Sequence, residues 1–586
     1  MRTALALALA GVALSAFTQD GGQDRPESIL PPGFGEPAPP APRATRSAET
    51  PAPAAPVSPA APAQPLPSAT PTPPPTPSAT LTPDAALLAR YEMPPSARRS
   101  LALVGAADER ESGVAADAFG AADGAYLEQL MRRLDAPLPS RWMSILLRRT
   151  LTARLDTPAR VNGADFAAER AWLLLRMGEA TAARAVVQGV DTGNYTPKLY
   201  QVAMNAMLAA SDPAGLCPVA DAGARFTGER GWTMAQAMCA ALSGGTARAN
   251  ALLKAARRGR VATGVDLLLA QKVIGAAGGG GAVTIEWPGV DRLTVWRFGL
   301  ASATGAAIPD DLYAGAGRQA TYWRALSPAV PLAERVAPAE AAAGQGVLSN
   351  LALVDLYGAV DAADDAPAPA NATAADLRTA YTAATSDARM AALRQLWGTN
   401  PDYGRLVLTA RAAVRIRPAA GNPDEARIVA SLLAGGLDRT AARWRGQVEE
   451  GGDAWAMLVL ADPDLSERLS YSTLAGYAGT GDAALKQRLL FAGLAGLGRL
   501  APDDIERAAQ ALDVRIGAEN AWTRALDRAA RANQPGTVAL LAAIGMQTPR
   551  WRGVPPEMLY RIVGALRAVG LGGEARMIAA EAIARG

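Results

Sequence analysis

The end of the chain shows most plainly what this sequence can fold into. Between Pro556 and Gly586, bulky apolar residues first recur at the i, i+3, i+4 and i+7 spacing of one helix face, namely Leu559, Ile562, Val563 and Leu566. Glycines follow at 570, 572 and 573, and they predict a helix end because glycine adopts φ > 0 at little cost. A second apolar face comes next, made of Ala575, Ile578, Ala579, Ala582 and Ile583. The pattern predicts two helices joined by a tight turn.

A glycine followed five and twelve positions later by small residues recurs upstream of this hairpin. The copies are Gly178-Ala183-Val190, Gly244-Ala249-Ala256, Gly436-Ala441-Val448 and Gly570-Ala575-Ala582. The spacing resembles the tetratricopeptide repeat, whose small residues let the two helices of a hairpin pack closely. The resemblance covers only part of the chain. It implies an all-α fold, an α-solenoid of stacked hairpins in which each hairpin covers its neighbour.

The 586-residue sequence contains no histidine, and this excludes several kinds of active site. Histidine is the usual general base near pH 7, so Ser-His-Asp and Cys-His systems and HExxH zinc sites are ruled out. Two cysteines alone cannot hold a structural zinc ion or an iron–sulfur cluster. The balance of 58 basic and 55 acidic residues gives a net charge of +3, which is too small to indicate nucleic acid as a partner. We expect no cofactor.

Residues 1–15 read as a cleaved secretory signal. Arg2 precedes an apolar run from Ala4 to Leu14, and Ala13 and Ser15 are small residues at the −3 and −1 positions of a cleavage point. The run is shorter than the roughly 20 residues that a membrane-spanning helix needs. The alternative is a buried N-terminal helix. The signal predicts a periplasmic or secreted protein.

Residues 16–83 are predicted to form a disordered Pro/Ala-rich arm. Twenty prolines lie between Pro26 and Pro83, and such a segment cannot bury enough apolar surface to order its backbone. Polyproline II is the conformation expected there. Within the arm, Ser28–Glu36 holds a cluster of bulky apolar residues and prolines: Ile29, Leu30, Pro31, Pro32 and Phe34. This cluster is either a docking motif for a partner or a chance feature of a biased composition.

The rest of the chain is predicted to be helical, in two regions. The first covers 84–360, an exposed Ala/Pro/Asp linker covers 361–375, and the second covers 376–586. Within the first region, apolar spacing predicts helices around residues 126–134 and 142–146, the latter beginning at Pro139-Ser140. Residues 283–288, after four glycines, are predicted to be extended. No later apolar run has the length of a membrane-spanning helix.

Cys217 and Cys239 are predicted to form a disulfide. Phe226-Thr227-Gly228 lies midway between them and is typical of a hairpin turn, so two antiparallel helices would bring the sulfur atoms to the same height. An oxidising compartment favours the bond. The alternative is two buried thiols in an alanine-rich core.

Other candidate sites have a structural interpretation beside the functional one. Asp310-Asp311 and Asp503-Asp504 follow prolines, where aspartates stabilise helix starts, and adjacent residues on a helix point apart. An aromatic cluster between 287 and 323 is a candidate groove for a glycan or peptide, or else fills the core where the repeat breaks. Its members are Trp287, Trp296, Tyr313, Tyr322 and Trp323.

Together these features predict an exported, non-catalytic α-helical scaffold that binds other envelope or exported proteins. The first alternative is a cell-wall glycan-cleaving enzyme with a superhelical domain, which would need a glutamate-bearing catalytic module. No stretch resembles Glu-Ser followed by Gly-Leu-Met-Gln. The second alternative is a cytoplasmic adaptor.

Overall fold

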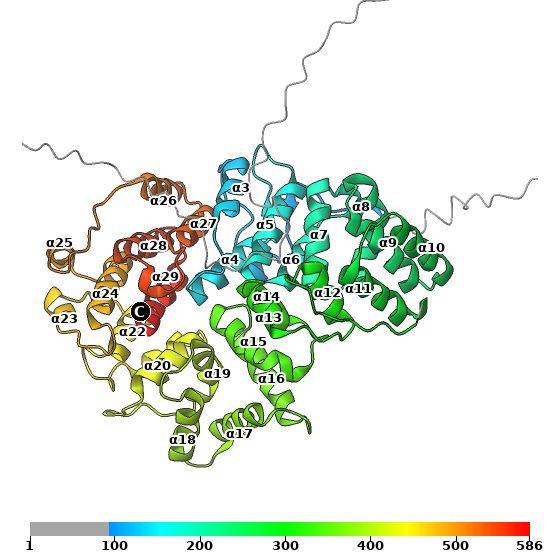
Figure 1. Cartoon of the computed structure of the whole chain (residues 1–586). Helices are drawn as coiled ribbons and strands as arrows, with labels where there is room; N and C mark the ends of the chain where they lie inside the picture. The colour runs from blue at the N-terminus through cyan, green and yellow to red at the C-terminus, as the bar shows by residue number, and fades with distance from the viewer. Residues whose placement is uncertain (1–92, 280) are drawn as a thin grey trace, which may run out of the picture. The chain divides into compact units, whose positions relative to one another are not determined.

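The computed structural model describes residues 93–279 and 281–586 (Figure 1). The chain divides into two units. The described part of one, residues 93–100, contains the short 3₁₀-helix η1 (Pro95–Ala97). The other is described from Leu101 to Gly586, apart from residue 280. The predicted signal and arm lie outside the described residues.

The described residues form an all-α protein with 28 α-helices, which confirms the all-α part of the predicted fold. The helices of the first half are α2 (Glu109–Ser112), α3 (Gly124–Arg133), α4 (Arg141–Thr152), α5 (Gly163–Met177), α6 (Ala180–Gln188), α7 (Pro197–Ala209), α8 (Ala220–Thr227), α9 (Arg230–Leu242), α10 (Thr246–Arg258), α11 (Gly264–Ile274), α12 (Val295–Ala303), α13 (Asp310–Ala314), α14 (Arg318–Leu326) and α15 (Leu332–Gln345). Those of the second half are α16 (Asn350–Asp361), α17 (Ala368–Thr382), α18 (Ser386–Trp397), α19 (Tyr403–Ala413), α20 (Glu425–Ala434), α21 (Asp438–Ala441), α22 (Asp453–Ala461), α23 (Tyr471–Ala475), α24 (Ala483–Leu497), α25 (Pro502–Ala511), α26 (Ala521–Arg531), α27 (Pro535–Gly545), α28 (Pro556–Ala568) and α29 (Gly572–Arg585).

Short elements complete the unit. They are the antiparallel pair β1 (Leu103–Val104) and β2 (Leu155–Asp156), the 3₁₀-helices η2 (Thr192–Asn194), η3 (Ala214–Val219), η5 (Ala442–Trp444) and η6 (Trp551–Gly553), and the π-helical turn η4 (Gly275–Gly279). The strand pair is not foreseen by the sequence pattern. Residues 283–288, predicted to be extended, form no strand.

The C-terminal hairpin has the predicted form. Helix α28 begins at Pro556 and packs on α29. All nine apolar residues of the two predicted faces are fully buried: Leu559, Ile562, Val563, Leu566, Ala575, Ile578, Ala579, Ala582 and Ile583. The periodicity therefore identified the packed faces correctly.

The glycines of the four sequence copies all occupy the same kind of helix end. Gly178, Gly244, Gly436 and Gly570 have φ between +78° and +87°, a region that favours glycine. At each one the next residue donates its amide to a carbonyl in the preceding turn, as Leu571 does to Leu566 (2.9 Å), which is a Schellman-type end. Each glycine joins two helices in a hairpin: α5–α6, α9–α10, α20–α21 and α28–α29.

Helix α4 lies against helices from both ends of the described unit (Figure 1). It packs on α5 and α6, which follow it closely in sequence, and also on α27 and α29. Ser140 is its N-cap, as predicted, and accepts the amide of Met143 (3.1 Å). The carboxylate of Glu581 in α29 accepts hydrogen bonds from Ser140 Oγ (2.6 Å) and from the amides of Arg141 (2.8 Å) and Trp142 (3.2 Å). A linear stack of hairpins does not predict this contact between the first helices and the last.

The first residue of α4 also joins two other helix ends. The buried guanidinium of Arg141 donates to the carbonyls of Ala434, at the end of α20, and of Leu348, just after α15 (3.1 and 3.3 Å). Burial lowers the pKa of Arg141 to about 10, so the group stays charged near neutral pH. A buried cation thus satisfies carbonyls that the helices themselves leave unpaired.

Two of the predicted local features have a different setting in the structure. The 361–375 range contains the end of α16, a short connection and the first half of α17, and these two helices pack against each other. Asp310 and Asp503 lie in the first turns of α13 and α25, as expected. Asp504, however, accepts a hydrogen bond from the amide of Tyr471 (2.7 Å), and so it binds an unpaired amide at the start of α23.

No helix among the described residues is long and apolar enough to cross a bilayer.

Candidate functional site

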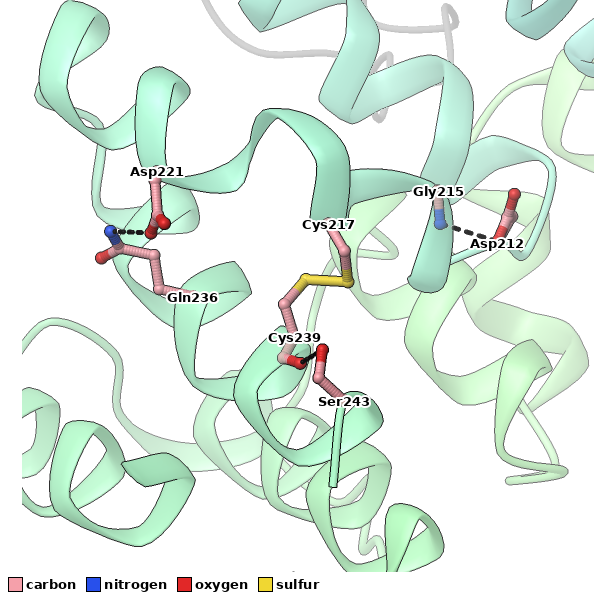
Figure 2. The surroundings of a disulfide bond; sticks show 7 residues. All are labelled: Asp212, Gly215, Cys217, Asp221, Gln236, Cys239 and Ser243. Carbon is pink, nitrogen blue, oxygen red and sulfur yellow. Dashed lines mark hydrogen bonds between the residues drawn. A yellow bond between two sulfur atoms is a disulfide. The ribbon is translucent and has the colours of Figure 1, made fainter. Parts of the chain in front are cut away.

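The two predicted cysteines are joined in the structure (Figure 2). The Cys217–Cys239 bond links η3 to α9, with an S–S distance of 2.11 Å and a Cα–Cα distance of 5.3 Å. Gly228, the last residue of the predicted turn, ends α8 with φ +67°. Helix α8 then packs on α9. The bond therefore attaches η3, which leads into α8, to α9.

A cavity of about 600 Å³ opens beside this segment, and we name it the α7–α8 groove. Its lining residues are Thr192, Gly193, Tyr195, Thr196, Pro197, Tyr200, Pro218, Val219, Ala222, Arg225 and Phe226. One wall comes from η2 and the first turn of α7, and the other from the end of η3 and α8. Arg225 is the single charged residue in this lining. The surface is therefore mainly apolar and aromatic.

The aromatic rings of the groove contact one another, and two of them are stacked. Phe226 lies parallel to Tyr200, with centroids 6.1 Å apart and planes inclined by 22°, and Tyr200 lies 5.3 Å from Tyr195. Phe226 is 60% exposed, whereas Tyr200 is only 2% exposed. The guanidinium carbon of Arg225 lies 5.3 Å from the Phe226 centroid. An exposed ring supported by a buried one is a rigid surface suited to apolar side chains and proline rings.

Local contacts hold each wall in place. Tyr195 donates its hydroxyl to the carbonyl of Val187 (3.0 Å). Thr196 caps α7 by accepting the amide of Leu199 (3.2 Å) and donates to Asp165 (2.6 Å). In α8, a Cβ on Gly223 would stand 2.5 Å from the Trp232 ring, so glycine is needed there for α8 to lie against that ring.

Burial also affects the supporting tyrosine. Desolvation raises the pKa of the Tyr200 phenol, and the charge of Arg225 opposes this. The ring of Trp232 meets Tyr200 edge-on at 6.0 Å. Tyr200 therefore serves as a neutral apolar platform near physiological pH.

The aromatic cluster predicted between 287 and 323 does not line an open groove. Tyr313, Tyr322 and Trp323 are buried. The first and last of them pack on the Phe298 ring, at 6.3 and 5.8 Å. This agrees with the alternative that these aromatic residues fill the core, because three α12–α14 rings meet in one apolar layer.

The two remaining members of that cluster are half-buried and bonded to backbone. Trp287 Nε1 donates to the carbonyl of Ala307 (2.7 Å), and Trp296 Nε1 donates to that of Asp266 (3.2 Å). Both indoles therefore anchor local chain segments.

Sequence reasoning missed the rings that do lie in a groove. The sequence pattern places Phe226 only in a turn, and it gives no indication of a role for Tyr195 or Tyr200. The three lie on η2–α7 and α8 and meet only because the helices fold together. The predicted docking motif, Ile29 to Phe34, lies outside the described residues.

A second cavity, of about 500 Å³, contains a buried ion pair. Asp453 accepts hydrogen bonds from Tyr477 Oη (2.5 Å), Thr480 Oγ1 (2.6 Å) and Lys486 Nζ (3.2 Å). Burial acts to raise the pKa of Asp453, but the hydrogen bonds from Thr480 and Tyr477 and the charge of Lys486 outweigh it and hold the pKa below its usual range. An ionised carboxylate with its oxygens engaged in this way joins α22 to α24.

Within residues 93–279 and 281–586, no three His, Cys, Asp or Glu side chains are grouped so as to hold a metal ion.

Comparisons of this chain with protein-family models, with curated proteins and with solved structures found no match.

Proposed function

We propose that this protein is an exported, non-catalytic helical scaffold whose hairpins stack as an α-solenoid and which binds other envelope or exported proteins. The observation that carries the proposal is the α7–α8 groove, in which the exposed Phe226 ring stands on the buried Tyr200 ring. Aromatic grooves bind polypeptide segments by covering apolar and proline side chains.

The disulfide supports the exported location. Structural disulfides persist in oxidising compartments and are rare in the cytosol. The Cys217–Cys239 bond holds the groove wall formed by Pro218, Val219 and α8. A periplasmic or secreted location would keep that wall attached to α9.

Location is tested by fractionation and mass spectrometry. The full chain is produced in a bacterium, its cell fractions are separated, and the mass of its N-terminal peptide is measured. A mature chain beginning at Ala16 in the periplasm or medium is the expected result. An unprocessed chain confined to the cytoplasm would favour the adaptor alternative.

Partner binding is tested from the groove itself. A photoreactive amino acid replaces Phe226 in one variant and Leu351 in a second, because Leu351 is also an exposed apolar residue, 54% exposed, but lies on α16. We expect polypeptide crosslinks at position 226 that are absent at position 351. Identical crosslinks at both positions would reject the groove as the binding site.

Absence of catalysis is tested on purified cell wall. In a zymogram the full chain should leave no cleared band, whereas a lysozyme control clears the gel. Clearing by this protein would favour the glycan-cleaving alternative.

A further inference from the structure

We infer that the α7–α8 groove binds the Ser28–Glu36 segment of the protein's own arm, an inference that rests on the proposed polypeptide-binding role of the groove. The segment has the sequence Ser-Ile-Leu-Pro-Pro-Gly-Phe-Gly-Glu. Its apolar residues are Ile29, Leu30 and Phe34, with Pro31 and Pro32 between them.

The groove has the chemistry that such a segment requires. Proline-rich chains are recognised by aromatic rings, because the rigid proline ring packs on an aromatic face with little loss of entropy. The groove presents Tyr195, Tyr200 and Phe226 with two prolines of its own in the walls. Its volume of about 600 Å³ is in the range of sites that enclose a few side chains.

The groove and the arm segment also carry opposite charges. Arg225 is the single charged residue that lines the groove, and its guanidinium lies over the exposed Phe226 ring. The segment is flanked by Glu27 and ends at Glu36, with no basic residue between them. A carboxylate at either end of the segment would be attracted to the Arg225 guanidinium.

The chain passes close to the groove at Gly105, four residues after it enters the described unit at Leu101. The carbonyl oxygen of Gly105 would stand 2.9 Å from a Cβ on Gly189, so these two backbones are adjacent. Gly189 precedes Thr192, the first lining residue, by three positions, a distance of at most about 10 Å along the chain.

The chain between the segment and this entry point is long enough to reach. About 67 residues separate Phe34 from Leu101. A fully extended polyproline II chain of this length spans roughly 210 Å, many times the distance to be covered, so the arm can bend back to the groove.

Because the segment is covalently linked to the groove, it competes with partner peptides for binding there. A linked ligand has an effective concentration on the order of 1 mM. If the segment itself binds the groove with a dissociation constant near 0.1 mM, a partner peptide would bind the intact chain roughly tenfold more weakly than a chain whose segment is disabled. The arm would thus set the threshold for partner binding.

The test uses full-length protein and a fluorescent peptide of residues 25–38, with a scrambled peptide as the control. Peptide affinity is measured by anisotropy for the wild type, for the arm variant Ile29→Ala/Leu30→Ala/Phe34→Ala, and for that arm variant with Phe226→Ala added. A matched control adds Leu351→Ala in place of Phe226→Ala. We expect the arm variant to bind roughly tenfold more tightly than the wild type. Phe226→Ala should abolish this binding, and Leu351→Ala should leave it unchanged.

The outcomes separate this inference from the proposed function. Equal peptide affinity of the wild type and the arm variant, with binding still lost on Phe226→Ala, would overturn occupation by the arm and keep the groove as a polypeptide site. Absence of peptide binding in every variant would overturn the inference, and the photocrosslinks described above would then decide the function separately.

Crosslinking identifies the occupant directly. With p-benzoylphenylalanine in place of Phe226, the inference predicts an intramolecular crosslink to a peptide within residues 25–38 whose yield does not depend on protein concentration. A crosslink that joins two chains and grows with concentration would show a second copy as the occupant. A crosslink only to other regions of the same chain would also overturn the inference.

Discussion

The carboxylate of Glu581 accepts a 2.6 Å hydrogen bond from the hydroxyl of Ser140, across 441 positions of the chain. It also accepts the amide of Arg141, so a residue of the last helix caps the start of α4. Carboxylates are favoured at helix N-termini, where amides are unpaired and the helix dipole is positive. This contact joins α4, near the start of the described unit, to its last helix through buried, charge-assisted hydrogen bonds.

Replacing Glu581 by glutamine should lower stability markedly. Glutamine keeps the shape but removes the charge, and it places an amide NH₂ against the donors of α4. Hydrogen bonds to a buried charged group contribute about 1.5–3 kcal/mol, so we expect the free energy of unfolding to fall by about 2–3 kcal/mol. Urea denaturation followed by circular dichroism measures the change.

A matched control for this variant is Glu574→Gln, also on α29. Glu574 pairs with Arg149 of α4 at 3.0 Å, but both side chains are partly exposed. Such pairs are worth roughly 0–1 kcal/mol. A loss in the control as large as that in Glu581→Gln would contradict the special role of the buried cap.

The stability of the protein should depend on pH through Glu179. Burial raises the pKa of this carboxyl from 4.5 to about 7, even though Arg148 lies 3.1 Å away and favours the ionised form. The folded state therefore binds a proton more tightly than the unfolded state. The contribution of Glu179 to the free energy of unfolding is fully present below about pH 4.5 and is lost as the pH rises through about 7.

The pH dependence caused by Glu179 can be measured without interference from histidine, because the chain contains no histidine to titrate between pH 5 and 8. Glu179→Gln keeps the side chain neutral at every pH. Near pH 4.5 it should match the wild type, and at pH 8 it should be more stable by about 3 kcal/mol, since one pKa unit corresponds to about 1.4 kcal/mol. A difference between the two proteins that stays constant with pH would refute the raised pKa.

Gly570→Ala tests the turn between α28 and α29. Gly570 has φ +84°, and a Cβ placed there would meet no atom within 4 Å, so the cost is purely one of backbone conformation. We expect a loss of about 1 kcal/mol. Gly573→Ala is the control: it lies inside α29 with open space around it and should stabilise by up to about 1 kcal/mol. Thermal melts should therefore show a lower melting temperature for Gly570→Ala and a higher one for Gly573→Ala.

Protein taken from the periplasm should contain no reactive thiol. Alkylation without reductant should leave Cys217 and Cys239 unlabelled, and quantitative labelling of the folded protein would refute the bond. In the chain-entropy model, a loop closed across 22 positions contributes about 3 kcal/mol. The Cys217→Ser/Cys239→Ser variant should lose about that much stability, and it should also bind groove peptides more weakly because the η3–α8 wall is released.

Local features of the fold were predictable because their causes are local. The faces of α28 and α29, the Ser140 cap and the turn at Gly228 follow from residue spacing, capping chemistry and the need for φ > 0. Other helix ends use the same turn but lack the repeated pattern, as at Gly346 and Gly498, because no alanine follows either glycine five positions later.

Residue spacing and turn chemistry are enough to show that this chain is helical, where several of its hairpins turn, and which helix faces are buried. Which of these faces meet depends on how the whole chain packs. Alanine-rich helix faces are alike and can pack in many orders, so spacing cannot show that Glu581 reaches Ser140. Nor can it show that Phe226 lies on Tyr200 while Trp323 is buried in the core. Such contacts join residues far apart in the chain, and their partners are fixed by how the helices pack together.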